Sequence, residues 1–252
     1  MSFVIAITGK GGVGKTTVAG LVIRGLIDRG KRPVLAVDAD PNTCLDGALG
    51  VKAEKTVGSV REDAREIAGQ GKVTGIAKQD LLNLKIAESL VEGEDFDLVA
   101  MGRPEGPGCY CYANNVLKQT LQEIASNYPY VVIDNEAGLE NLSRRIVTKA
   151  DLMVLVADPS RRGLDTVKRL FDLAREMGVQ YGKLVVVVNR VHEPASASAF
   201  EAIREYTGAD FVVVLPDNLE LARSDENGLC LLKLPAANDV VVRMNGFLDK
   251  VM

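Results

Sequence analysis

The chain has 252 residues, of which 47% are hydrophobic and 25% are charged, so it can bury a sizeable core as one large domain over residues 1–252. Its formal net charge of −4 disfavours a broad nucleic-acid-binding surface, because neutralising phosphates takes clustered Lys and Arg. No apolar run approaches the ~20 residues of a membrane span and no cleavable basic leader opens the chain, so we expect a cytoplasmic protein whose partners include neither membrane nor nucleic acid.

Short, β-branched apolar runs alternate with longer helical stretches along the chain. Strands are expected at Phe3–Thr8, Pro33–Asp38, Phe96–Met101, Tyr130–Asp134, Leu152–Ala157, Leu184–Asn189 and Phe211–Leu215. Helices are expected at Lys15–Arg29, Val57–Ala68, Lys78–Val91, Asn114–Ser126, Leu139–Lys149, Leu164–Met177, Ala197–Tyr206, Leu219–Asn227 and Asn238–Lys250. Several strands are almost wholly apolar, as parallel strands covered on both faces are. The alternation predicts an α/β fold with a doubly wound, mostly parallel sheet of about seven or eight strands flanked by helices.

The segment Gly9-Lys10-Gly11-Gly12-Val13-Gly14-Lys15-Thr16 matches the template of a phosphate-binding P-loop. It follows the first expected strand and opens the first expected helix, which is the context that the motif requires. Glycines let the loop N–H groups face the phosphates, and the helix N-terminus adds partial positive charge. Lys15 is expected to reach the β- and γ-phosphates, and the Thr16 hydroxyl to bind Mg²⁺. The expected nucleotide-binding residues of the loop are Gly11, Gly12, Val13, Gly14, Lys15, Thr16 and Thr17.

Two further segments place carboxylates after apolar strands. Asp38 and Asp40 end the second strand and point the same way if the strand continues, which puts both near the phosphates at the carboxyl edge of the sheet. Val131-Val132-Ile133-Asp134 is the Walker B pattern, which places Asp134 near Mg²⁺. Gly138 follows shortly and is expected to swing its amide to the γ-phosphate as part of a switch segment. The alternative for Asp38 and Asp40 is two solvated aspartates that close a strand.

Lys10 is a second lysine inside the loop, and this feature resembles the deviant Walker A motif of the MinD/ParA and nitrogenase iron-protein group. The resemblance implies that Lys10 reaches the nucleotide of a partner subunit, and hence an ATP-dependent homodimer. It also implies that Asp40 activates or orients the attacking water, acting as a catalytic residue with Lys10 and Lys15, while Asp38 contributes to Mg²⁺ through water. A solvated lysine at a loop tip is the alternative for Lys10.

Base recognition also rests on this resemblance. Asn189 ends a strand as Val-Asn-Arg, a position that resembles the adenine-binding asparagine of the group. Pro216 and Asp217 follow the next strand and are expected to complete the base pocket. A strand cap and a turn are the alternatives, so the choice of ATP over GTP depends on the resemblance.

Cys109-Tyr110-Cys111 follows a loop rich in Pro and Gly. Two thiolates at this spacing can hold one soft metal ion, and a two-fold axis between two such pairs would supply the four ligands that Zn²⁺ prefers. Square-planar Ni²⁺ suits the same ligands, and two buried apolar cysteines are the alternative. Cys44 and Cys230 are single and are expected to be structural. The one histidine, His192, is expected on a surface loop.

Over essentially its whole length the sequence resembles the CooC-type nickel-insertion ATPases, which mature carbon monoxide dehydrogenase. The marks are the loop with Lys10, Asp38–Asn42, the cysteine pair, and Asp134–Gly138 followed by Glu140, Ser143, Arg144 and Arg145. The resemblance implies a homodimer that ATP closes, Ni²⁺ or Zn²⁺ on Cys109 and Cys111, and Mg²⁺-dependent ATP hydrolysis that accompanies metal delivery to a client nickel enzyme. Nucleotide state and metal affinity would then be coupled reciprocally.

Three alternatives stay open. A MinD- or ParA-like positioning ATPase would act on a membrane or DNA, but MinD-like proteins need a basic amphipathic C-terminal helix, and the charges of Asp239–Met252 balance. An iron–sulfur scaffold would carry its cluster on the cysteine pair. A binding switch would hydrolyse ATP negligibly.

Overall fold

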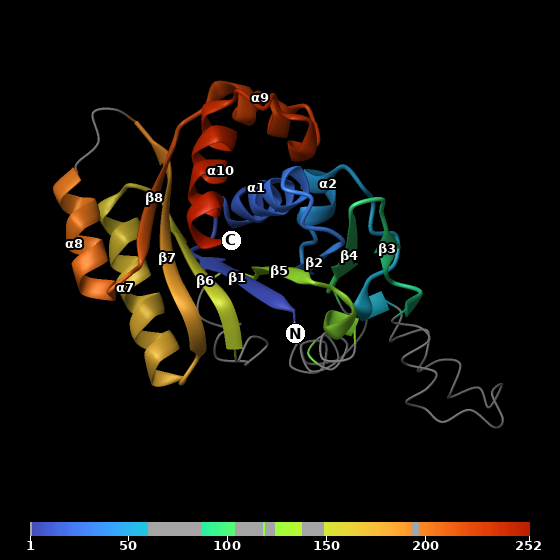
Figure 1. Cartoon of the computed structure of the whole chain (residues 1–252), viewed down its shortest axis with the longest axis horizontal. Helices are drawn as coiled ribbons and strands as arrows, with labels where there is room; N and C mark the ends of the chain where they lie inside the picture. Colours follow the sequence, from blue (N-terminus) through green and yellow to red (C-terminus); the bar gives the residue numbers. More distant parts are fainter. Residues whose placement is uncertain (1, 60–86, 104–117, 119–123, 138–148, 193–196) are drawn as a thin grey trace.

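The computed structural model describes residues 2–59, 87–103, 118, 124–137, 149–192 and 197–252. Within these ranges eight strands form one sheet in the order β3-β4-β2-β5-β1-β6-β7-β8 (Figure 1). The strands are β1 (Phe3–Gly9), β2 (Val34–Ala39), β3 (Val91–Glu92), β4 (Phe96–Ala100), β5 (Tyr130–Asn135), β6 (Lys149–Ala157), β7 (Gln180–Val191) and β8 (Phe211–Pro216). Neighbouring strands are parallel, except that β3 and β4 are antiparallel. The expected doubly wound, mostly parallel α/β fold is confirmed.

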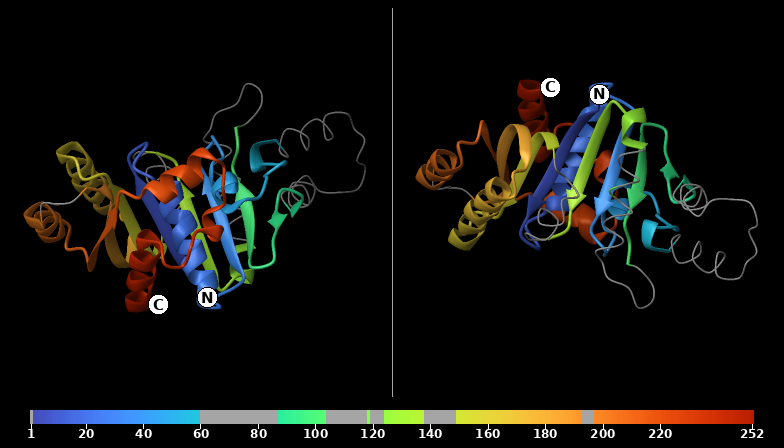
Figure 2. Two further views of the ribbon diagram at one scale, coloured as in Figure 1. Left: turned by 90° about the horizontal axis from the view of Figure 1, so that it is seen from above. Right: turned by 90° about the horizontal axis from the view of Figure 1, so that it is seen from below.

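Helices cover both faces of this sheet, as the three views in Figures 1 and 2 show. Those in the described ranges are α1 (Lys15–Asp28), α2 (Leu45–Leu49), α7 (Arg161–Glu176), α8 (Ala197–Thr207), α9 (Leu219–Glu226) and α10 (Asp239–Val251), with 3₁₀ turns η1 (Ala125–Asn127) and η2 (Leu231–Lys233). The helices α1 and α10 lie side by side on one face, and α7 and α8 lie on the other face beside β6, β7 and β8. None of the described helices has the length and apolarity needed to cross a bilayer.

The strands contribute to the core on both faces because successive side chains alternate. Ile5 and Ile7 of β1 are fully buried under α1 and α10, whereas Ala6 faces the opposite layer together with Leu35 and Val37 of β2. The apolar runs in the sequence therefore reflect burial on two sides.

The last helix, α10, packs its apolar side against α1 and β8. Its buried side chains are Val240, Val241, Met244, Phe247, Leu248 and Val251. Asn238 caps its N-terminus by accepting a hydrogen bond from the Val240 N–H at 3.0 Å. The apolar face of this helix is thus committed to the core of the protein.

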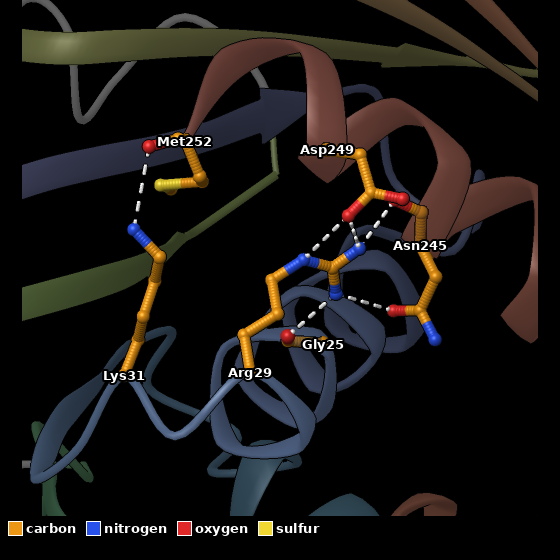
Figure 3. Close-up of polar contacts among 6 residues, drawn as sticks. All are labelled: Gly25, Arg29, Lys31, Asn245, Asp249 and Met252. Atoms are coloured by element: carbon orange, nitrogen blue, oxygen red, sulfur yellow. Dashed lines mark hydrogen bonds and ion pairs between the residues drawn. The ribbon is translucent and has the colours of Figure 1, made fainter.

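Polar contacts at the far end of α1 hold α10 in place (Figure 3). The Arg29 guanidinium donates to Asp249 Oδ1 at 2.6 Å and to Asn245 Oδ1 at 2.8 Å. The Lys31 ammonium donates to the backbone oxygen of Met252 at 3.3 Å. These bonds connect residues 216 to 221 positions apart, so they depend on the tertiary fold.

Three expected helices end differently from the prediction. Val91 was expected to close a helix but pairs with Leu98 in the short hairpin of β3 and β4, because Gly93 allows the chain to turn back. Lys149 was also expected in a helix, yet it begins β6, where it pairs with Gln180. Ala125, expected near the end of a helix, lies in the 3₁₀ turn η1. Residues 60–68, 78–86, 114–117, 119–123 and 139–148 of the four helices expected between Val57 and Lys149 lie outside the described residues.

Candidate functional site

The P-loop connects the end of β1 to the start of α1 at the carboxyl edge of the sheet. Gly14 precedes α1 with φ of 91°, in the left-handed region that suits glycine, and a Cβ there would collide with the amide of Asn189. A Cβ on Gly9 would collide with the backbone oxygen of Val156 on β6. The loop therefore takes its path because glycine occupies these positions, as the motif predicts.

Two P-loop side chains face the interior. The Lys15 side chain is buried, with its Nζ 3.5 Å from the backbone oxygen of Lys10. The Thr16 hydroxyl donates a hydrogen bond to Asp134 Oδ2 at 2.6 Å. The structure thus brings together the P-loop threonine and the Walker B aspartate, which are far apart in the sequence.

Asp38 and Asp134 form a pair of buried carboxylates on neighbouring strands. Their Cα atoms are partners in the register of β2 and β5, and their side chains are 0% and 1% exposed. Burial raises the pKa of Asp38 to about 6 and that of Asp134 to about 7. Asp38 adds to the rise at Asp134, whereas the Thr16 hydroxyl and the Lys15 ammonium oppose it. Burial therefore disfavours the charged form of both carboxylates.

The donor set at this position fits Mg²⁺. Asp134 Oδ1 is buried and makes no hydrogen bond within the described part of the chain, although its partner oxygen is bonded to Thr16. A hydroxyl and carboxylate oxygens are the ligands that Mg²⁺ prefers, together with phosphate oxygens and water. Thr16 and Asp134 are the residues that would hold the ion, and Asp38 is the buried partner of Asp134 on the neighbouring strand.

Asp38 also organises the chain that follows β2. Its Oδ1 accepts the N–H of Asp40 at 3.0 Å, and its Oδ2 accepts the N–H groups of Cys44 and Leu45, both at 2.8 Å. β2 ends at Ala39, so the condition under which Asp38 and Asp40 would alternate along one strand is not met. The buried carboxylate bends the backbone into a turn, and Asp40 lies in this turn.

The Asp40 carboxylate is oriented by its neighbours. Its Oδ1 accepts both the backbone N–H and the side-chain amide of Asn42, each at 2.9 Å. Asn42 in turn accepts a hydrogen bond from Arg103 at 2.5 Å. Asp40 is only half-buried, which leaves it accessible at the mouth of the site.

Asn189 packs against the P-loop from the end of β7. Its side chain is buried and its amide donates to the backbone oxygen of Val13 at 2.9 Å. Pro216 ends β8 opposite Val191, and the Asp217 N–H donates to Val191 oxygen at 3.0 Å. The structure therefore brings the three residues expected at the base to one edge of the sheet, with Asn189 also supporting the loop.

The last residue of β5 contacts β1, and the residues that follow it lie beside the P-loop. The Asn135 amide donates to the backbone oxygen of Ile7 at 2.9 Å, and a Cβ on Gly11 would contact Ala137 at 3.5 Å. Asn135 belongs to the run Asp134–Gly138 that marks the resemblance, but its bond to β1 is not predicted from the sequence. Gly138 lies outside the described residues.

Lys10 is exposed at the loop tip. It lines a hollow of about 350 Å³ with Arg162, Asp165, Thr166 and Arg169, four residues that lie on one side of α7. The hollow therefore carries three cations against one carboxylate.

Cys109 and Cys111 lie outside the described residues. Among the described residues, no three His, Cys, Asp or Glu side chains gather as a metal-binding group. Cys44 is exposed and Cys230 is half-buried, with its thiol donating to the backbone oxygen of Leu49 at 3.0 Å. His192 is exposed, as expected, and its Nδ1 lies 3.7 Å from Asp217 Oδ2.

Comparison with known proteins agrees with this geometry. The AAA_31 family, described as an AAA domain, matches residues 2–183. An uncharacterized ATP-binding protein of Methanocaldococcus jannaschii is 42% identical over 250 residues, which cover 99% of this chain and 98% of the relative. The carbon monoxide dehydrogenase accessory protein CooC of Rhodospirillum rubrum is 32% identical over 248 residues, which cover 93% of this chain and 92% of CooC.

The fold is also that of a solved cell-division protein. The septum site-determining protein MinD of Pyrococcus horikoshii, in complex with Mg-ADP, has a TM-score of 0.71 to this structure at 18% sequence identity. The likeness covers 100% of this chain and 97% of that protein. At this level of identity the comparison shows a shared fold.

Proposed function

The chain belongs to the AAA_31 family, described as an AAA domain, and is related to CooC, and on this premise we propose that it is an ATP-dependent metal-delivery protein. In this proposal a homodimer couples the binding and Mg²⁺-dependent hydrolysis of ATP to the insertion of Ni²⁺ into a client nickel enzyme, carbon monoxide dehydrogenase. The observation that carries the ATPase part is the 2.6 Å contact of Thr16 with Asp134, beside buried Asp38 and at the foot of the P-loop.

The residues in and around the P-loop have different roles in binding and hydrolysing ATP. The loop from Gly11 to Thr17 binds the phosphates through its N–H groups, and buried Lys15 offsets the charge of the β- and γ-phosphates. Mg²⁺, when bound at Thr16 and Asp134, neutralises the charge that develops on the phosphate oxygens. Asp40 orients the attacking water, and its bonds from Asn42 keep its carboxylate in place.

Adenine is recognised at the ends of β7 and β8. Asn189 uses one amide N–H on the backbone oxygen of Val13, which leaves its carbonyl oxygen and its second N–H for the base. Pro216 and Asp217 form the adjoining wall. This arrangement supports ATP as the substrate.

Lys10 acts across the dimer. It is exposed at the loop tip beside the basic residues Arg162 and Arg169, where an approaching anion is attracted. Lys10 of each subunit reaches the nucleotide bound by the other. ATP therefore stabilises the dimer, and loss of the γ-phosphate weakens it.

The metal is held at the two-fold axis by Cys109 and Cys111 from each subunit. The support for this is the Cys-x-Cys spacing together with a relative, CooC, that matches nearly the whole chain. Hydrolysis relaxes the turn at Asp40 and the segment after Asp134, which changes the geometry at the cysteines. Metal affinity then depends on nucleotide state, and linkage makes the dependence reciprocal.

Metal binding tests the proposal directly. Equilibrium dialysis with Ni²⁺ and Zn²⁺ measures the stoichiometry for the wild type, Cys109→Ser/Cys111→Ser, and the control Cys44→Ser/Cys230→Ser, which loses the same number of thiols. We expect one ion per dimer in the wild type and the control, none in the first variant, and an affinity that changes with a non-hydrolysable ATP analogue. A brown colour with visible absorption would instead indicate an iron–sulfur cluster.

A second candidate is a MinD- or ParA-like positioning ATPase, which the shared fold favours. The apolar face of α10 is buried against α1 and β8, so this helix has no free apolar side for a membrane. Absence of specific metal binding in the wild type, combined with ATP-dependent sedimentation on anionic vesicles or DNA, would favour this candidate.

A further inference from the structure

The end of β7 departs from regular strand geometry beside the P-loop. The register between β7 and β8 shifts between Val188 and Val191, and Arg190 has φ of 59°, in the left-handed region. In a regular strand Asn189 and Arg190 would point to opposite faces of the sheet. A bulge changes the direction of side chains in this way.

Because of this irregularity, two successive side chains reach two successive carbonyls of the loop. The Asn189 amide donates to Val13 oxygen at 2.9 Å, and the Arg190 Nη1 donates to Gly12 oxygen at 3.1 Å. Asn189 is buried whereas Arg190 is exposed. The strand end therefore holds the loop at both an inner and an outer point.

Arginine is an unfavourable residue for this backbone conformation. Glycine or asparagine would adopt a φ near 59° with less strain, but neither has a side chain long enough to extend as the guanidinium does. A strained residue persists where its surroundings determine its conformation, and such residues gather at functional sites. The strained conformation of Arg190 therefore suggests that its contact with Gly12 has a functional role.

Gly12 depends on outside support. It is exposed, has φ of 80°, and a Cβ placed on it would find no described atom within 4 Å, so packing does not restrain the peptide. Within the described part of the chain, Arg190 is the residue whose side chain donates a hydrogen bond to the Gly12 oxygen.

We propose that Arg190 is a positioning residue of the phosphate site, which keeps the Gly12 carbonyl turned toward β7 so that the following loop N–H groups stay directed at the phosphates. This inference rests on the proposed nucleotide binding and adds a residue outside the P-loop to it. Since Arg190 acts through the loop backbone, it supports ADP and ATP alike, which separates its role from that of Lys10 at the partner's nucleotide.

The test compares Arg190→Asn, which tolerates the left-handed backbone and lacks the guanidinium, with Arg190→Gly and Arg190→Lys. The control is Arg175→Asn, which removes one exposed positive charge at the far end of α7. The affinities of fluorescent ADP and ATP analogues and the thermal unfolding of the nucleotide-free protein are measured for each. We expect about tenfold weaker binding of both nucleotides in the Asn and Gly variants, an intermediate loss with Lys, and less than twofold in the control.

The melting temperatures decide between positioning and a merely structural role. Positioning predicts that the Asn and Gly variants melt no lower than the wild type, since they relieve strain. Wild-type affinity in these two variants would overturn the inference, and so would a loss confined to low salt that Lys fully restores, because that result indicates charge alone. A wild-type protein that binds neither nucleotide would overturn the proposed function as well, so the two failures are distinguishable.

Discussion

Asp134→Asn should make the nucleotide-free protein more stable while abolishing its ATPase activity. The carboxyl of Asp134 is 1% exposed, and burial raises its pKa from 3.8 to about 7. Between these two values the unfolded chain gives up the proton more readily than the folded protein, so stability falls as the pH rises from 3.8 through about 7. The amide of Asn has the same shape and carries no charge, which removes this penalty.

The magnitude follows from the two pKa values. A rise from 3.8 to about 7 corresponds to about 4 kcal/mol of stability lost at pH 8 and almost none at pH 4. For a chain of 252 residues this is on the order of 10 °C in melting temperature. The amide retains an oxygen that can accept the Thr16 hydroxyl, so we expect the hydrogen bond to survive.

The assay is thermal unfolding in EDTA between pH 4 and pH 8, which keeps Mg²⁺ away from the site. The variant and the wild type should unfold together near pH 4, and the variant should unfold about 10 °C higher at pH 8. Asp165→Asn, on the exposed side of α7, is the matched control and should follow the wild type. Parallel melting curves at every pH would refute the argument that Asp134 carries a buried, poorly compensated charge.

Three further outcomes are expected. Asp40→Asn should lower phosphate release by about 100-fold or more while fluorescent ATP binds within twofold of the wild type, and equal losses in both would contradict a role on water. Lys10→Gln should leave ADP affinity unchanged but abolish dimers formed with an ATP analogue in sedimentation, whereas persistent dimers would argue against contact across the interface. Arg29→Ala should lower the free energy of unfolding in urea by about 2 kcal/mol, because Asn245 loses a hydrogen-bond partner. Asp249→Ala should lower it by less than about 1 kcal/mol, because the Asp249 side chain is exposed. Equal losses would contradict the larger role of the Asn245 contact in Figure 3.

The sequence determines those features whose physics is local. The glycines, Lys15 and Thr16 are contiguous, and backbone freedom and a helix N-terminus suffice to build a phosphate loop from them. The long strands can also be predicted from the sequence, because a strand buried on both faces needs an apolar run such as Val131–Ile133. For the same reason Asp134 is identifiable as the polar end of a buried strand.

The tertiary structure decides features that depend on strand order. Thr16 contacts Asp134, and Asn189 supports Val13, only because β5 and β6 flank β1 and β7 follows β6 in the sheet. The bulge that turns Arg190 toward Gly12 arises between two strands and has no signature in either alone. The short hairpin containing Val91 has the same origin, since its pairing with β4 outweighs the helical pattern around it. A periodic pattern specifies which face a residue buries, whereas its partners are set by which strand lies alongside, and that choice is made only when the whole sheet assembles.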